Sequence, residues 1–173
     1  MTRLLAAVGL AAMGIVALHV DIDACGDKSL SAGGVRMQRA LAARYPASIL
    51  IYGQPSSRLS DASRELKLPA TLQQVGHKYR EVSTSSELQA ALASGQFNVV
   101  IADFSDVADL QARLESLTSR PAIVPIAYKL TKTETAEAAR QCRFLIKAPG
   151  RSSQYLTTIA EAVRSTSHSS GKG

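Results

Sequence analysis

An aspartate and a lysine occupy places in this chain where side chains of parallel sheets often do chemistry. Asp103 directly follows the apolar run Val99–Ala102, and Lys147 directly follows the run Phe144–Ile146. In α/β proteins, ligands bind outside the carboxyl ends of parallel strands. A carboxylate and an ammonium group there can pair with each other or hold a small polar ligand. Two unrelated residues at strand ends are the third interpretation.

The cysteines and histidines give no second constellation. The chain has two cysteines, Cys25 and Cys142, and three dispersed histidines without metal-ligand spacing, so no metal site is expected. In an oxidising compartment the two thiols can form one disulfide that ties the N-terminal arm to the domain. Two free thiols are the alternative. No hydrolase motif or glycine-rich phosphate loop appears, and we expect no enzyme activity, catalytic residue or cofactor.

Residues 1–24 are typical of a secretory signal. Arg3 is the only early charge, and Leu4–Leu18 contains only apolar and small residues. Such signals combine a positive start with an apolar segment of about 7–15 residues, whereas a spanning helix needs about 20. We therefore expect export, to the periplasm or out of the cell, with a mature chain that begins at Cys25. A lipid anchor on Cys25 is the alternative, and Asp23 argues against it.

The charge pattern argues against anionic partners. The formal net charge is +6, but Lys and Arg are scattered singly along the 173 residues. Nucleic-acid-binding segments usually gather their cations and interleave them with aromatic side chains. Trp is absent, and aromatic residues make up 5% of the chain. We therefore expect no nucleic-acid partner and no membrane contact beyond the signal segment.

From Ser48 onward, short apolar runs alternate with amphipathic segments. The runs predict five strands, at Ile49–Tyr52, Tyr79–Val82, Val99–Ala102, Ala122–Ala127 and Phe144–Ile146. The segments between and after them predict five helices. The first spans Leu59–Leu68 and breaks at Pro69, and two others begin with the capping-box spacing of Thr84 with Glu87 and of Thr131 with Glu134, respectively.

This alternation predicts an α/β fold, a three-layer α/β/α arrangement around a doubly wound, five-stranded parallel sheet. Right-handed crossovers favour the flavodoxin-like strand order 2-1-3-4-5. Pro125 falls inside the fourth strand, where it cannot donate to the ladder, so we expect a bulge or an early strand end. An N-terminal arm with a short strand and a helix covers residues 25–47, the domain covers 48–164, and a disordered tail covers 165–173.

In pattern and spacing, residues 48–164 resemble the receiver domain of response regulators. The best-matching segments are Tyr79–Leu92, Phe97–Leu117 and Phe144–Val163. The resemblance implies acidic residues that bind Mg²⁺ after the first strand and a phosphoacceptor aspartate at the end of the third. It also implies a Thr or Ser hydroxyl after the fourth strand and a lysine after the fifth, both in contact with the phosphoryl group.

Carried onto this chain, the resemblance places Asp103 at the phosphoacceptor position and Lys147 at the position of the lysine. The acidic pair falls on Gly53 and Gln54, and the hydroxyl position falls on Ile126. Mg²⁺ prefers hard oxygen ligands that include one or two carboxylates, and phosphoryl transfer depends on such a cation. These substitutions therefore predict a degenerate phosphorylation site.

Three functions are compatible with this pattern. The first is an exported pseudo-receiver, a non-catalytic interaction or signalling module with a protein partner. The second is a cytoplasmic response-regulator receiver that is phosphorylated on Asp103. The third is a small-molecule-binding flavodoxin-like protein, for which Gly53–Ser57 is the nearest approach to a phosphate-binding loop.

Overall fold

The computed structural model describes residues 36–37, 39–40, 42–55 and 57–169. Its strands are Ser48–Tyr52 (β1), Lys78–Val82 (β2), Val99–Asp103 (β3), Ala122–Tyr128 (β4) and Ile146–Ala148 (β5). Its helices are Arg58–Glu65 (α2), Leu68–Val75 (α3), Ser85–Ala93 (α4), Val107–Glu115 (α5), Lys132–Gln141 (α6) and Ser152–Ser169 (α7), with a 3₁₀ turn at Phe104–Asp106 (η1). Residues 36–37, 39–40 and 42–44 are helical as well, and we call them the N-terminal helical segment.

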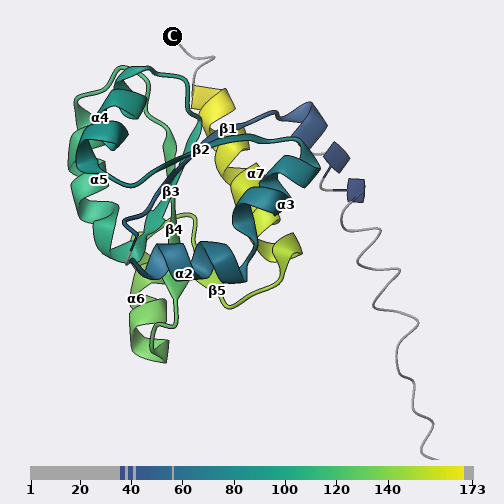
Figure 1. The fold of residues 1–173 in the computed structure, drawn as a ribbon, viewed down its shortest axis with the longest axis vertical. Coiled ribbons are helices and arrows are strands. Elements are labelled where there is room, and N and C mark those ends of the chain that lie inside the picture. Colours follow the sequence, from purple (N-terminus) through teal and green to yellow (C-terminus); the bar gives the residue numbers. More distant parts are fainter. Residues whose placement is uncertain (1–35, 38, 41, 56, 170–173) are drawn as a thin grey trace, which may run out of the picture.

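All five strands run parallel in the order β2-β1-β3-β4-β5, which confirms the predicted topology. Helices α2, α3 and α7 pack on one face of the sheet, and α4 and α5 pack on the other (Figure 1). The fold is therefore a flavodoxin-like α/β fold, and the carboxyl ends of all the strands lie at one edge of the molecule.

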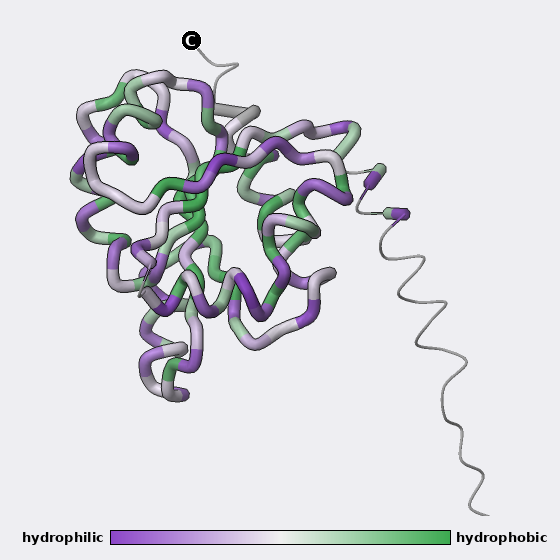
Figure 2. Tube along the Cα trace, in the orientation of Figure 1, coloured by the Kyte–Doolittle hydropathy of each residue, from purple (hydrophilic) through white to green (hydrophobic). Residues whose placement is uncertain are grey.

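The central strand β3 joins two hydrophobic cores. Val99 and Ile101 are fully buried in the core under α2, α3 and α7, and Val100 and Ala102 are fully buried in the core under α4 and α5. Side chains alternate between the faces of a sheet, so a strand covered on both sides must be apolar at every position. Figure 2 shows the same result as a strongly hydrophobic centre under a more polar surface.

Pro125 fits into β4 without breaking its register with β3, where it lies opposite Ala102. The Ala122 amide donates to the Asn98 carbonyl on the β3 side at 2.9 Å. Amide directions alternate along a parallel strand, so the nitrogen of Pro125 faces the β5 side. There β5 begins only opposite Ile126. No ladder partner faces the missing N–H, and the bulge or early end that we expected does not occur.

The fifth strand begins later than predicted. We expected Phe144–Ile146, whereas β5 spans Ile146–Ala148 and contains Lys147. Phe144 is only partly buried and packs against the first core without a ladder partner. The apolar run therefore marked a packing contact before the strand, and the prediction of a strand at Phe144 was wrong.

Two helix boundaries also differ from the prediction. The helix that we expected to break at Pro69 already breaks at Leu66–Lys67, where Lys67 has a positive φ of 49°. The hydroxyl of Tyr155 donates to the Leu66 carbonyl at 3.1 Å and fixes this junction. The predicted disordered tail is helical as far as Ser169, because α7 continues beyond residue 164. Residues 170–173 lie outside the described part.

The predicted capping boxes are both present. The side chains of Thr84 and Thr131 accept from the backbone amides of Glu87 and Glu134, whose carboxylates accept from the threonine amides. The helix expected in the N-terminal arm corresponds to the N-terminal helical segment. The predicted signal, the short strand of the arm and Cys25 lie outside the described residues. Within the described ranges, no helix is long and apolar enough to cross a membrane.

His77 is a buried polar residue between α3 and β2, only 7% exposed. Among the described residues, its Nδ1 atom has no hydrogen-bond partner. Burial lowers the pKa of His77 from its ordinary value of 6.5, because the charged imidazolium loses its hydration. The folded state therefore resists protonation of this side chain.

This burial predicts that stability decreases in acid. The unfolded chain takes up the His77 proton near pH 6.5, and the folded chain takes it up only at lower pH. The contribution of neutral His77 is thus complete above pH 6.5 and is lost as the pH falls below that value. Urea unfolding of the wild type should give a smaller unfolding free energy at pH 5.5 than at pH 7.5. The same change of pH should lower the unfolding free energy of His77→Leu by less. An equal pH dependence in both proteins would contradict this.

Candidate functional site

Asp103 caps the turn that follows β3. It is 7% exposed, and its Oδ1 atom accepts from the Ser105 amide at 3.0 Å and from the Ser105 hydroxyl at 2.9 Å. As the N-cap residue of η1, the side chain satisfies a free amide at the start of the turn. The position predicted for a phosphoacceptor therefore holds a carboxylate with a local structural role.

The neighbours of Asp103 across the sheet carry no oxygen ligands. On the β1 side the register pairs Tyr52 with Ala102, so Gly53 follows beside Asp103. On the β4 side Asp103 pairs with Ile126, which is 1% exposed and belongs to the hydrophobic core. The structure thus brings together three residues of the predicted site, namely Asp103, Gly53 and Ile126.

Packing of Leu59 keeps the position of Gly53 free of side chains. A Cβ atom added to Gly53 would lie 2.9 Å from Cδ2 and 3.3 Å from Cγ of Leu59. Leu59 is 1% exposed in the core beneath α2, so it has little room to move. The neighbouring Gln54 is exposed, and its carbonyl accepts from the Ser57 amide at 2.9 Å in a turn. The site of the missing carboxylates is therefore filled by an apolar contact.

Lys147 does not reach Asp103. Asp103, Ile126 and Ile146 share one row across the sheet, whereas Lys147 stands one row later, opposite Ala127. Adjacent rows point to opposite faces, and Lys147 lines a small hollow beside α6. No ion pair joins Asp103 and Lys147 among the described residues, so the first of the three interpretations, a pair between them, is not found.

Asp106 is an acidic neighbour that the sequence did not single out. Burial raises the pKa of Asp106, and the nearby carboxylates of Asp103 and Asp109 raise it further. Within the described ranges, no group of three His, Cys, Asp or Glu side chains is arranged to hold a metal ion. Gly53 and Gln54 give no carboxylate, so these residues do not fit the Mg²⁺ site that the fold resemblance implies.

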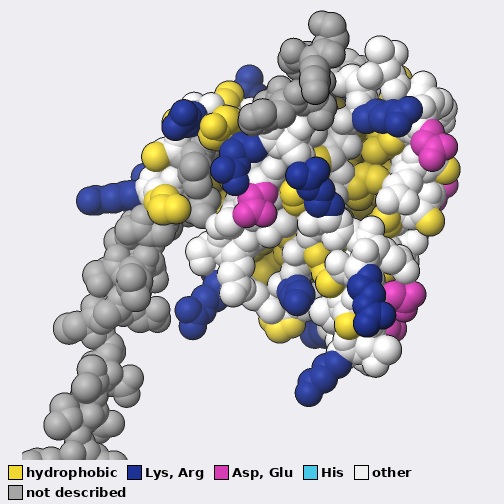
Figure 3. Space-filling model, turned by 180° about the vertical axis from the view of Figure 1, so that it is seen from behind, with side chains coloured by type: hydrophobic (Ala, Val, Ile, Leu, Met, Phe, Trp, Pro, Cys, Tyr) yellow, Lys and Arg dark blue, Asp and Glu magenta, His cyan; other side chains and the backbone are white. Residues whose placement is uncertain are grey.

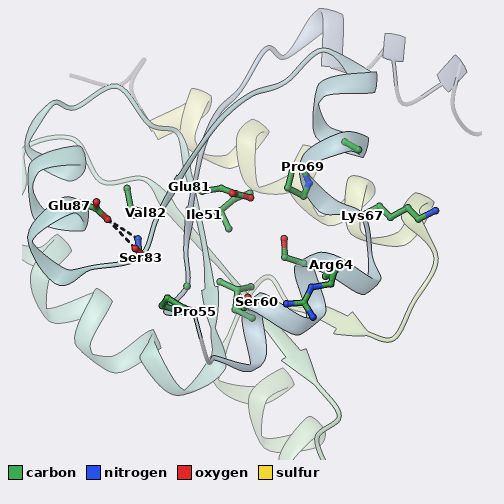
Figure 4. A pocket seen from close by; sticks show the side chains of 14 residues that line it. Ile51, Pro55, Ser60, Arg64, Lys67, Pro69, Glu81, Val82, Ser83 and Glu87 are labelled. Carbon is green, nitrogen blue, oxygen red and sulfur yellow. Dashed lines mark hydrogen bonds between the residues drawn. The ribbon is translucent and has the colours of Figure 1, made fainter.

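A cleft of about 680 Å³ opens at the carboxyl ends of β1 and β2. Its floor is apolar and includes Ile51, Leu59 and Val82. Arg64 and Lys67 belong to the α2–α3 wall, and Figure 4 shows Glu81 reaching from β2 toward that wall while Lys67 points outward. Sequence reasoning missed this cleft, because its walls meet only through the pairing of β2 with β1.

Two charged residues that line the cleft, Glu87 and Arg64, interact with neighbouring residues. Glu87 accepts from the Ser83 and Thr84 amides at 3.0 and 3.2 Å, and these bonds lower the pKa of its carboxyl. Arg64 contacts Asp61 at 3.5 Å, but both side chains are mostly exposed and the pair is weak. The cleft therefore offers opposite charges above an apolar floor.

Cys142 lies at the end of α6 and is half-buried with a free thiol in this structure. Burial raises the pKa of the thiol, which lowers its nucleophilicity at neutral pH. Cys25 lies outside the described residues, so the disulfide between them remains a prediction.

Comparison with protein-family models finds no matching family, and comparison with curated proteins finds no matching relative.

The contact between Gly53 and Leu59 predicts a steric penalty. Gly53 does not need a positive φ, so a Gly53→Ala substitution tests space alone. We expect it to lower the unfolding free energy by about 1–3 kcal/mol through overpacking. In a Leu59→Ala background the same substitution should cost clearly less, and urea unfolding of the four proteins measures the coupling. Equal costs in both backgrounds would show that Leu59 does not fill this position.

Proposed function

We propose that the chain is an exported pseudo-receiver that acts as a non-catalytic protein-interaction or signalling module. The resemblance to receivers supports the fold-level part, because strand order and helix placement agree with it. The apolar stretch in residues 1–24 supports export. Histidine kinases that use ATP work in the cytoplasm, so an exported receiver needs no phosphorylation chemistry.

The packing of Leu59 against Gly53 is the observation that carries this proposal. Gly53 matches one position of the acidic pair, and a Cβ atom there would already lie 2.9 Å from Cδ2 of Leu59, so packing opposes a carboxylate side chain at this position. Asp103 uses Oδ1 to cap η1, and its partner across β4 is the apolar Ile126. A receiver without cation ligands and without the hydroxyl that contacts the phosphoryl group can still bind a protein through its surface, but it cannot be regulated by phosphorylation.

A lightly covered part of the sheet supports a protein partner. Helix α6 is polar, and Ala138 is its only residue recorded as buried. Ile123 and Phe144 are only partly buried, and both line a hollow of about 460 Å³ between α5 and the end of α6. Half-buried apolar side chains around a hollow can accept a side chain of another protein.

Small-molecule binding is the second candidate, and the cleft between α2–α3 and β2 favours it. Its volume of about 680 Å³ lies in the range of ligand sites. The cleft also lies outside the carboxyl ends of strands, where α/β proteins bind ligands. A thermal-shift screen with nucleotides and flavins separates this candidate from the first, because a pure interaction module should show no shift.

Phosphorylation gives the sharpest test of the pseudo-receiver. Incubation with acetyl phosphate and Mg²⁺ should leave no phosphoryl group on Asp103, because no carboxylates hold the cation beside it. Intact-mass measurement checks the result, with an active receiver domain treated in parallel as a positive control.

The alternative of a working receiver predicts the opposite result. Mg²⁺-dependent labelling that disappears in Asp103→Asn would show that Asp103 is phosphorylated and would refute the proposal. Labelling that persists in Asp103→Asn would come from another residue and would leave the assignment of Asp103 as a cap intact.

A further inference from the structure

Folding gathers cations that are scattered in the sequence. The N-terminal helical segment carries Arg36, Arg39 and Arg44, and the edge strand β2 carries Lys78 and Arg80. All five are exposed, and none forms an ion pair with another described residue. Seen from behind, the molecule shows Lys and Arg side chains around the N-terminal helical segment, with hydrophobic ones between them (Figure 3).

Backbone contacts hold these two elements together. Arg44 ends the helical segment just before β1, and the first residue of β1, Ser48, pairs with Lys78. The Lys78 amide also donates to the Ala47 carbonyl at 3.0 Å. At its other end, the segment is tied to α3 by Arg39, whose Nε donates to the Gln74 carbonyl at 3.1 Å. Side chains alternate along β2, so Lys78 and Arg80 point to the face of the sheet that α4 covers, whereas Tyr79 points to the face on which the helical segment and α3 pack. The cations therefore line both sides of the free edge of β2.

The same two elements carry both large hydrophobic side chains that are exposed in the described part of the chain. Met37 is 64% exposed on the helical segment, and Tyr79 is 37% exposed on β2. We call these seven residues the basic patch: Arg36, Met37, Arg39, Arg44, Lys78, Tyr79 and Arg80. Helix α3 beside it has no charged residue, and Glu81 on β2 turns toward the cleft (Figure 4). Helix α3 therefore adds no negative charge beside the patch.

From this composition we propose that the basic patch binds the surface of an anionic lipid bilayer. Arginine and lysine pair with lipid phosphates, while methionine and tyrosine enter the boundary between headgroups and acyl chains. None of the patch residues lines any of the three hollows described above. A basic surface with exposed methionine and tyrosine side chains suits the anionic and partly apolar boundary of a bilayer. An acidic peptide added along the free edge of β2 is a separate outcome of the test below.

The proposal differs from the expectation from sequence, in which dispersed cations indicated no membrane contact beyond the signal segment. It also does not depend on the proposed function, because the patch lies away from Asp103 at the amino ends of β1 and β2. Failure of the phosphorylation test and failure of the membrane test are therefore separate results.

Tyr79→Trp provides a local reporter, because the chain contains no tryptophan. We expect the tryptophan emission of the full-length protein to shift to the blue with vesicles of phosphatidylcholine that contain about 30 mol% phosphatidylglycerol. Pure phosphatidylcholine vesicles should leave it unchanged. Phe104→Trp, placed at the opposite end of the sheet, should not respond to either. Comparison of the emission at position 79 with that at position 104 distinguishes contact of the patch with the vesicle from binding through the apolar N-terminal residues.

A charge variant and a matched control complete the test. Arg36→Gln, Arg44→Gln and Lys78→Gln, combined in the reporter protein, should weaken vesicle binding on the order of 100-fold. The control combines Lys132→Gln, Arg140→Gln and Arg151→Gln, which remove the same charge from other surfaces, and it should bind almost as the parent does. Added salt should weaken the parent strongly.

Three results would overturn the proposal. The first is a Tyr79→Trp emission that does not change with anionic vesicles, and the second is an equal loss of binding in both triple variants. The third is a shift caused by a double-stranded DNA oligonucleotide or by poly-glutamate without a response to vesicles. That result would make the patch a site for nucleic acid or for an acidic protein.

Discussion

The structure depends on a central strand that is buried on both faces. Every residue of β3 is buried, so helices must cover both sides of the sheet. The same demand for apolar packing extends to the ends of the strands. It places Ile126 beside Asp103 and Leu59 over Gly53, where a receiver needs oxygen atoms. Apolar packing therefore takes the two positions at which a receiver carries a hydroxyl and a carboxylate.

The parts of the fold that follow from local periodicity could be predicted from the sequence. Apolar runs identified the strands, and the Thr84–Glu87 capping box marked a helix start, because both signals are short-range. The preference for right-handed crossovers then gave the order of the strands. The late start of β5 and the break at Leu66–Lys67 were missed, since partners distant in sequence decide them. Tyr155, far along the chain, holds the break through its hydroxyl. Pro125 looked costly only because the length of its neighbour β5 was unknown.

The candidate site divides in the same way. Asp103, Gly53 and Ile126 could be placed together from strand ends alone, and the structure brings them together. Lys147 could not, because it lies inside β5 instead of after it, one row beyond Asp103, and therefore points to the other face of the sheet. The cleft and the basic patch depend on which strand lies at the edge. The cations of the basic patch are therefore scattered in the sequence and come close together only in the fold.

The measurement that tests this account most directly is the intact mass of the protein from its native cell, by compartment, under conditions that preserve acyl phosphates. The account predicts a mass that starts at Cys25, outside the cytoplasm, without an added phosphoryl group. A gain of two hydrogens on reduction would also establish the bond between Cys25 and Cys142. A full-length chain in the cytoplasm that carries a phosphoryl group on Asp103 would contradict the account.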